Sequence, residues 1–264
     1  MESALEEIEF LALSENRVEV LRLLADDRHT RGELAAATGA SQATLGRILG
    51  DFEDRSWIRR EDGEYAATAT GRLVAEGFTD LLEILETEGE LRDVVRYLPT
   101  HAMDVDLRRL ADATVTTPSQ TRPNAPVQRV LDLLGDADEI RVFSHAFNEQ
   151  SIAQIRDRVV DGGAAFRGVF SRSAVDALAD DAALRERFGS LLAADDAAVR
   201  VREEGIPLAA TVADGTVHLL LRDENGVLRA SVDTDDPAVR SWAQDTFDHY
   251  WRTATPLDAA EFSD

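Results

Sequence analysis

Apolar residues in the first third of the chain recur every three or four positions, which is the spacing of one face of an α-helix. The pattern predicts a helix after Ser14, a second from Thr30 to Thr38, and a third from Ser41 to about Arg55. Serine and threonine are common at such starts because their hydroxyls accept hydrogen bonds from free backbone amides. The chain is therefore expected to begin with short helices joined by tight turns.

The third of these helices has two unlike faces. One face carries four large apolar residues at helical spacing, Leu45, Ile48, Leu49 and Phe52. The opposite face carries alanine and glycine around Arg47, so little side chain separates its backbone from an approaching surface. Asp51 and Asp54 are expected to point away from any DNA bound there.

A hairpin is predicted directly after this helix. A strand over 58–60, a turn at 61–63 and a returning strand over 65–68 follow Trp57. Helix, turn, helix and hairpin in this order predict a winged helix-turn-helix over residues 1–70.

Residues 71–115 are expected to form a helical connector. A long helix is predicted from about Arg72 to Leu98, weakened by Gly77 and Gly89, with a short amphipathic piece near 105–110. Because of its apolar positions, this helix is expected to form the dimer interface. The threonine-, serine- and proline-rich stretch Thr114 to Pro126 indicates a loop or an extended segment.

Residues 116–264 alternate strand and helix signals. Strands are predicted near 139–143, 165–170 and 199–201, separated by helical segments, before a meander that Asp214-Gly215 and Asn225-Gly226 punctuate. A closing helix begins at Asp236-Pro237, and its aromatic residues are expected to belong to the core. The pattern predicts an α/β domain with a mixed sheet, and the whole chain is expected to be an α/β protein of two domains.

Composition narrows the classes of function. The chain has no cysteine, which excludes disulfides, thiolate metal sites and cysteine nucleophiles. No stretch approaches 18 consecutive apolar residues, so no membrane span is predicted. The first ten residues carry four glutamates rather than a basic start and an apolar run, and the protein is therefore expected to be cytoplasmic.

The net charge of the chain bears most on how it could bind DNA. The net charge is −23, residues 1–70 alone carry −7, and every basic residue is an arginine. A uniformly acidic chain without lysine resembles the proteins of extreme halophiles, in which surface carboxylates maintain hydration in concentrated salt. Affinity for DNA normally grows with phosphate neutralisation and counterion release, and that contribution shrinks in molar salt. A basic patch is therefore not a useful criterion for this chain.

The segment TRGELAAATGASQATLGRILGDFEDRSWIRREDGEYAATATGRLVAEGF resembles the winged-helix module of archaeal transcriptional regulators. The resemblance implies that the second helix of the motif enters the major groove of double-stranded DNA while the wing lies along the backbone or the minor groove. By position, Gln42, Thr44 and Arg47 are candidates for contacts to base edges, and Ser41 at the helix start is a further DNA-binding candidate. Candidates for phosphate contacts are Arg31, Arg59 and Arg60. A winged helix that contacts proteins instead of DNA is the alternative.

The chain from about His101 onward resembles the FilR1-type domain of archaeal winged-helix regulators. The resemblance lies in ADEIRVFSHAFNEQ, in GTVHLLLRDENGVL and in the ending DDPAVRSWAQDTFDHYWRTATPL. It implies a domain that senses a small-molecule effector or aids dimerisation.

This architecture also distantly resembles phospholipase-D-like domains, whose catalysis needs a His-x-Lys motif that a chain without lysine cannot contain. Strand-end residues remain candidates for ligand binding, namely Ser144, His145, Arg172 and His218. No zinc spacing, phosphate loop or nucleophile elbow is present, so no catalytic residue, metal or cofactor is predicted. The leading hypothesis is a homodimeric regulator that binds specific DNA sequences; a sensor or scaffold is the second, and an enzyme the third.

Overall fold

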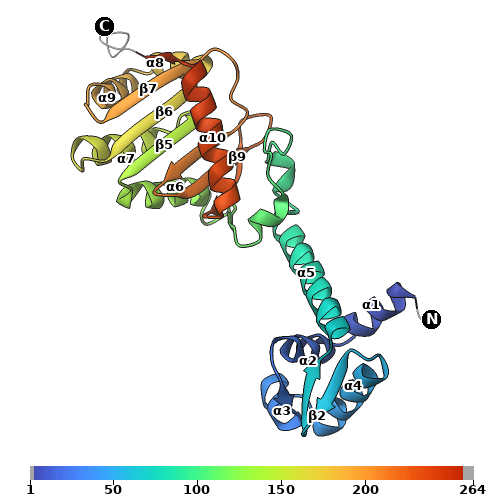
Figure 1. The fold of residues 1–264 in the computed structure, drawn as a ribbon. Helices are drawn as coiled ribbons and strands as arrows, with labels where there is room; N and C mark the ends of the chain where they lie inside the picture. The colour runs from blue at the N-terminus through green and yellow to red at the C-terminus, as the bar shows by residue number, and fades with distance from the viewer. Residues whose placement is uncertain (1–2, 258–264) are drawn as a thin grey trace. The chain divides into compact units, whose positions relative to one another are not determined.

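The computed structural model describes residues 3–257, and the chain divides into two compact units, Met1–Glu86 and Thr87–Asp264 (Figure 1). The first unit contains the helices α1 (Ala4–Ala12), α2 (Glu15–Asp26), α3 (Arg31–Thr38) and α4 (Gln42–Asp54), and most of α5 (Ala69–Leu91). Its antiparallel sheet has the order β1 (His29–Thr30), β3 (Glu64–Ala67), β2 (Ile58–Glu61). This element order confirms the predicted helix-turn-helix followed by a hairpin.

The start of each helix in the motif follows from a capping side chain. At α3, the Glu33 amide donates to Thr30 Oγ1 (3.3 Å) and the Thr30 amide donates to the Glu33 carboxylate (2.7 Å), which confirms the predicted capping box. At α4, the Thr44 amide donates to Ser41 Oγ at 3.1 Å. Ser14 stands at the N-cap of α2, but its side chain makes no capping hydrogen bond.

One core holds the first unit together. Leu34 of α3 and the predicted apolar face of α4 are buried with residues of α2, the wing and the start of α5. The helix α5 also approaches the wing closely at Gly71, where a Cβ atom would lie 2.7 Å from the Trp57 carbonyl carbon. Only a residue without a side chain fits this contact, so the wing and α5 are joined at a fixed point.

The second unit is built on a mixed sheet. Within the described residues its strand order is β11 (Thr255–Pro256), β7 (Ala197–Arg202), β6 (Ala165–Ser171), β5 (Glu139–Ser144), β8 (Ala209–Ala213), β9 (Thr216–Arg222), β10 (Leu228–Thr234), β4 (Thr114–Thr116). Strands β5, β6 and β7 are parallel and the other pairings are antiparallel. The helices are α6 (Ala125–Asp136), α7 (Glu149–Val160), α8 (Arg172–Ala179), α9 (Ala182–Leu192) and α10 (Pro237–Thr253). The predicted mixed-sheet α/β architecture is confirmed.

Each face of this sheet has its own hydrophobic core. Helix α10 packs on one face, where Phe143 of β5 and Phe247 of α10 are buried (Figure 1). The helices α6, α7, α8 and α9 supply the core of the other face, with Ile140 and Phe166. The expected core role of the aromatic residues of α10 is confirmed, since Trp242, Tyr250 and Trp251 all pack against the first of these cores.

After residue 86 the structure differs from the sequence-based expectation in several elements. The long helix ends at Leu91, and two short 3₁₀ helices, Val95–Tyr97 and Leu107–Leu110, follow it. Leu91, Leu98 and Leu110 are buried in the core of the second unit, so residues 87–115 pack as part of that unit. Residues 114–116 form an edge strand on β10, and α6 occupies a stretch for which no helix was predicted.

Candidate DNA-binding surface and ligand cavity

The N-terminal half of α4 presents small and polar side chains to solvent. Gln42, Ala43, Gly46 and Arg47 are exposed, while the opposite face of the helix is buried. Among the described residues Arg47 makes neither an ion pair nor a hydrogen bond, so its guanidinium keeps all five donors free. Such a group on a rigid helix suits bidentate contact with a guanine edge.

Two of the predicted DNA contacts also have structural roles. Ser41 Oγ and Thr44 Oγ1 lie 2.9 Å apart, and both belong to the cap of α4. A residue that caps a helix can still donate to phosphate, but its replacement would change the helix start as well as any contact. These two side chains therefore give less interpretable variants than Arg47.

Arg31 lies against the start of α4 rather than free in solvent. Its guanidinium donates to the Gln42 backbone carbonyl, and a Cβ atom at Gly46 would stand 2.7 Å from Arg31 Nη2. Gly46 thus leaves the space that Arg31 fills, and the arginine ties α3 to α4. Its assignment as a phosphate contact stays a prediction.

The acidic residues of α4 do not point away from the exposed face. Each helical residue advances about 100°, so Asp51 lies within about 40°, and Asp54 within about 20°, of the direction of Arg47. The expectation that both point away from bound DNA stays a prediction. They are separated from Arg47 along the axis by one and two turns, and Arg17 pairs with Asp51 at 3.7 Å. Negative charge on this side of α4 is therefore confined to its C-terminal half, where Asp54 also lines the groove described below.

The wing combines arginines with acidic residues. Asp62 and Gly63 have φ of 53° and 90°, the left-handed conformation that a two-residue hairpin turn requires. Arg59 pairs with Glu61 at 2.8 Å, whereas Arg60 lies 5.4 Å from the centre of the Tyr65 ring and has no carboxylate partner among residues 3–257. Arg60 is consequently the wing residue best placed to reach a phosphate.

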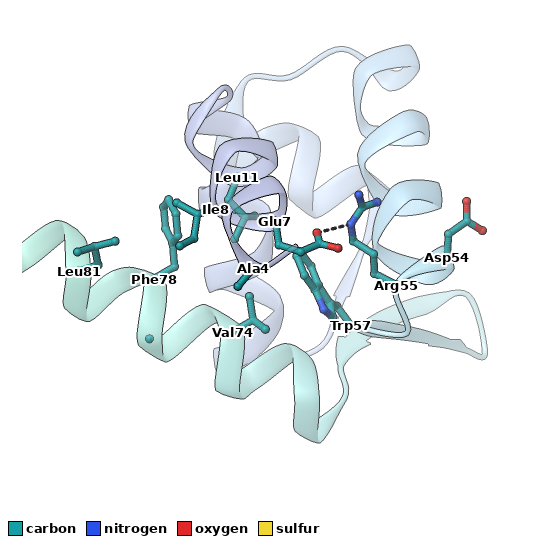
Figure 2. A pocket seen from close by; sticks show the side chains of 11 residues that line it. Ala4, Glu7, Ile8, Leu11, Asp54, Arg55, Trp57, Val74, Phe78 and Leu81 are labelled. Atoms are coloured by element: carbon teal, nitrogen blue, oxygen red, sulfur yellow. Dashed lines mark hydrogen bonds and ion pairs between the residues drawn. The ribbon is translucent and has the colours of Figure 1, made fainter. Parts of the chain in front are cut away.

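An apolar groove lies between α1 and α5 of the first unit (Figure 2). Its volume is about 700 Å³, and Ile8 of α1 faces Val74, Phe78 and Leu81 of α5 across it. Glu7 accepts a hydrogen bond from Arg55 Nε at 2.7 Å at the edge of the groove. Apolar side chains outside the groove on the same two helices are also exposed, namely Leu5, Leu13, Leu73, Ile84 and Leu85.

The second unit contains a smaller, more enclosed cavity of about 70 Å³. It lies between α6, α7 and the strands β5, β8 and β9. Of the four residues proposed as ligand contacts, Ser144 and His218 line it. His145 does not line it, although burial and then the nearby Arg222 lower the pKa of its imidazole. Arg172 pairs with Glu203 at 3.0 Å and is not part of the lining.

His218 is held by a buried charged network. Its side chain is 1% exposed and Nδ1 contacts the Asp233 carboxylate, which also accepts from Arg129 Nε at 2.7 Å. Burial alone would raise the pKa of Asp233, but hydrogen bonds and charge from His218 and Arg129 hold it below its usual range. Neither Asp233 nor Arg129 stood out in the sequence, because they lie on different elements and meet only in the fold.

Arg222 was also missed by sequence reasoning. It follows His218 by four positions on β9, so both side chains lie on the same face of the strand, and both line the cavity. The alternation of His218, Leu220 and Arg222 was the available signal. Among residues 3–257, no three histidine, aspartate or glutamate side chains gather as metal ligands would, and no helix is long and apolar enough to span a membrane.

Comparison with known families decides the class of protein. Residues 123–253 match the family described as methanogenesis regulatory protein FilR1, middle domain, and residues 5–90 match the HVO_A0261 N-terminal domain. The chain belongs to the archaeal regulators with a FilR1-type domain. The FilR1-type domain occupies the second unit and contains the cavity. No curated protein matches this FilR1-type regulator.

Several solved structures align with parts or most of this chain. TrmBL2, described as an archaeal chromatin protein with a novel mode of DNA binding, is 16% identical over 97% of this chain and 100% of its own, with a TM-score of 0.41. The phospholipase D family member Nuc from Salmonella typhimurium is 13% identical over 55% of this chain and 99% of its own, with a TM-score of 0.44. A mutant of ZitR from Lactococcus lactis is 20% identical over 33% and 64%, with a TM-score of 0.28. Fold likeness of this degree does not define a function.

Proposed function

We propose that this FilR1-type regulator binds specific sequences of double-stranded DNA through the N-terminal half of α4. The observation that carries the proposal is the exposed face around Arg47, which has small neighbours and a guanidinium without a partner among the described residues. Because residues 1–70 carry a net charge of −7, general attraction to phosphate does not supply the affinity. Base-edge contacts and shape supply it instead.

The roles of the remaining residues follow from their positions. Gln42, which is exposed in the first turn of α4, contacts a base edge, while Ser41 and Thr44 at the cap of this helix contact backbone phosphate. Arg60 and, when released from Glu61, Arg59 contact phosphate from the wing. Arg31 holds the start of α4 in place.

The regulator acts as a homodimer. One winged helix reads few base pairs, and a two-fold pair doubles the site. The groove between α1 and α5 and the exposed leucines beside it form a surface that a second copy covers, since Leu5 and Leu73 are 75% and 69% exposed. An apolar groove with further exposed leucines on the same helices favours an interaction site on a protein with so acidic a composition. The second unit senses a small-molecule effector.

The test is selection of fragments from genomic DNA of the source organism at about 2 M KCl, followed by affinity measurements on the fragment recovered. Arg47→Ala is expected to weaken binding to that fragment by about 1–3 kcal/mol, roughly 5- to 150-fold. The matched control is Arg22→Ala, which removes the same charge from α2, where Arg22 pairs with Glu19 at 2.9 Å. Failure to recover any fragment, or equal loss in both variants, would reject the proposal.

A further inference from the structure

The cavity of the FilR1-type domain contains buried polar atoms that the protein itself does not satisfy. Both His218 Nε2 and Arg222 Nε are buried, and neither has a hydrogen-bond partner in the part of the chain that the structure describes. Buried polar groups are nearly always paired, because leaving one unpaired costs about 1–3 kcal/mol. Two such atoms on the lining of one cavity indicate a ligand that completes them.

At the end of the cavity lined by His218, Asp233 determines which ring nitrogen is available to a ligand. Its carboxylate accepts a hydrogen bond from His218 Nδ1, so Nε2 is the ring nitrogen that is left without a partner. Arg129 pairs with the same carboxylate and satisfies its charge. A ligand hydroxyl suits His218 Nε2, because a hydroxyl can both donate and accept a hydrogen bond.

The chemistry at the other end is cationic. Arg222 donates through Nη1 to the Gly226 carbonyl at 2.8 Å but forms no ion pair with any described carboxylate. Asn148 and Ser151, at the N-terminus of the 12-residue helix α7, line the same cavity. The positive end of a helix and an unpaired guanidinium together favour an anion, and one arginine matches a monoanionic carboxylate better than a phosphate dianion.

The distance between the two ends limits the shape of the ligand. His218 and Arg222 are four residues apart on one strand, which separates their Cα atoms by about 13 Å. Leu220 lies between them, and Leu134, Ile152 and Ile155 face it across the cavity. At about 10–15 Å³ for each water-sized group, a cavity of about 70 Å³ holds roughly five to seven non-hydrogen atoms, which favours a short, slender chain.

We infer that this cavity binds a short, unbranched carboxylate with a terminal hydroxyl, its carboxylate on Arg222 and its hydroxyl on His218 Nε2. The inference deepens the effector-sensing role proposed above and rests on it for biological meaning, but binding itself does not depend on DNA. Arg222 stands at the carboxyl ends of the parallel strands, where α/β sheets commonly bind ligands.

The test uses calorimetric titration of the full chain with three probes, 4-hydroxybutyrate, butyrate and butane-1,4-diol. The wild-type protein is expected to bind 4-hydroxybutyrate about tenfold more tightly than either of the other two, since butyrate lacks the hydroxyl and the diol lacks the carboxylate. Arg222→Gln should abolish the preference over the diol and leave the preference over butyrate. His218→Gln, whose amide can still donate to Asp233, should do the reverse.

The control is Arg229→Gln, which removes the same charge from β10, where Arg229 pairs with Asp223. It is expected to leave all three affinities unchanged. If His218→Gln fails to fold, the ranking of probes on the wild-type protein and on Arg222→Gln still decides. No binding of any probe at 10 mM, or an unchanged ranking in Arg222→Gln, overturns the inference. If the protein binds the probes but binds no DNA, the proposed DNA-binding function is rejected while the inferred ligand site is retained.

Discussion

Replacement of Gly71 by alanine should destabilise the winged-helix unit although it adds only a methyl group. The new Cβ atom would lie 2.7 Å from the Trp57 carbonyl carbon and 3.1 Å from Trp57 Cα, with the carbonyl oxygen closer still. All three are backbone atoms, so no side chain can rotate away. Either α5 or the start of the wing must move.

The magnitude follows from what that movement disturbs. Overpacking of this kind costs about 1–3 kcal/mol. The Trp57 carbonyl also accepts hydrogen bonds from the Thr68 amide (2.8 Å) and the Thr68 hydroxyl (3.1 Å). Weakening these adds about 1 kcal/mol, so the loss in free energy of unfolding should be about 2–4 kcal/mol.

Hydrogen exchange read by mass spectrometry on peptides of α4 reports on this unit alone. A loss of 2 kcal/mol raises their exchange rate about 30-fold. The control Gly50→Ala places the same methyl group in α4, where nothing lies within 4 Å, and it should slow exchange because alanine stabilises a helix by about 1 kcal/mol over glycine. Equal effects of the two substitutions would refute the steric reasoning.

Two further predictions concern the groove and the charged network. Leu81→Glu should convert a dimer into a monomer, as measured by light scattering after gel filtration. The control is Leu107→Glu, which should leave the dimer intact because Leu107 is equally exposed at 37% but lies outside the groove. A monomeric wild-type protein would contradict the proposed dimer interface. Because the pKa of Asp233 is lowered in the fold, its contribution to stability is present above its unfolded pKa and is lost as pH falls through the folded value. The free energy of unfolding of the second unit should therefore fall less between pH 5 and pH 3 in Asp233→Asn than in the wild type. Parallel pH profiles of the two proteins would contradict this.

Local chemistry made the first unit predictable from sequence. Thr30 with Glu33, and Ser41 before α4, are capping signals that need only neighbouring residues, and the structure confirms both. The strand β1 was not predicted, because it has two residues and exists only through pairing with β3.

Contacts between distant residues limited prediction in the second unit. β4 lies in a segment rich in turn-forming residues and becomes a strand only because β10 offers an open edge. The partners of His218 come from α6 and β10, and no local pattern links Arg129 to Asp233, which lies 104 residues away. Arg172 looked like a strand-end ligand and instead pairs with Glu203 on the surface. The fold class could thus be read from the sequence, whereas the composition of the cavity could not.

The most direct test of the account is the salt dependence of DNA affinity, measured by fluorescence anisotropy on the selected fragment and on a scrambled one between 0.5 and 3 M KCl. The three arginine candidates for phosphate contacts, Arg31, Arg59 and Arg60, neutralise at most six phosphates in a dimer. The slope of log K against log salt concentration should therefore be shallower than about −5. The account predicts that preference for the selected fragment persists at 3 M KCl and is lost in Arg47→Ala. The account would be contradicted by a steeper slope together with equal affinity of the protein for the two fragments, or by a steeper slope together with equal affinity of the wild type and Arg47→Ala for the selected fragment.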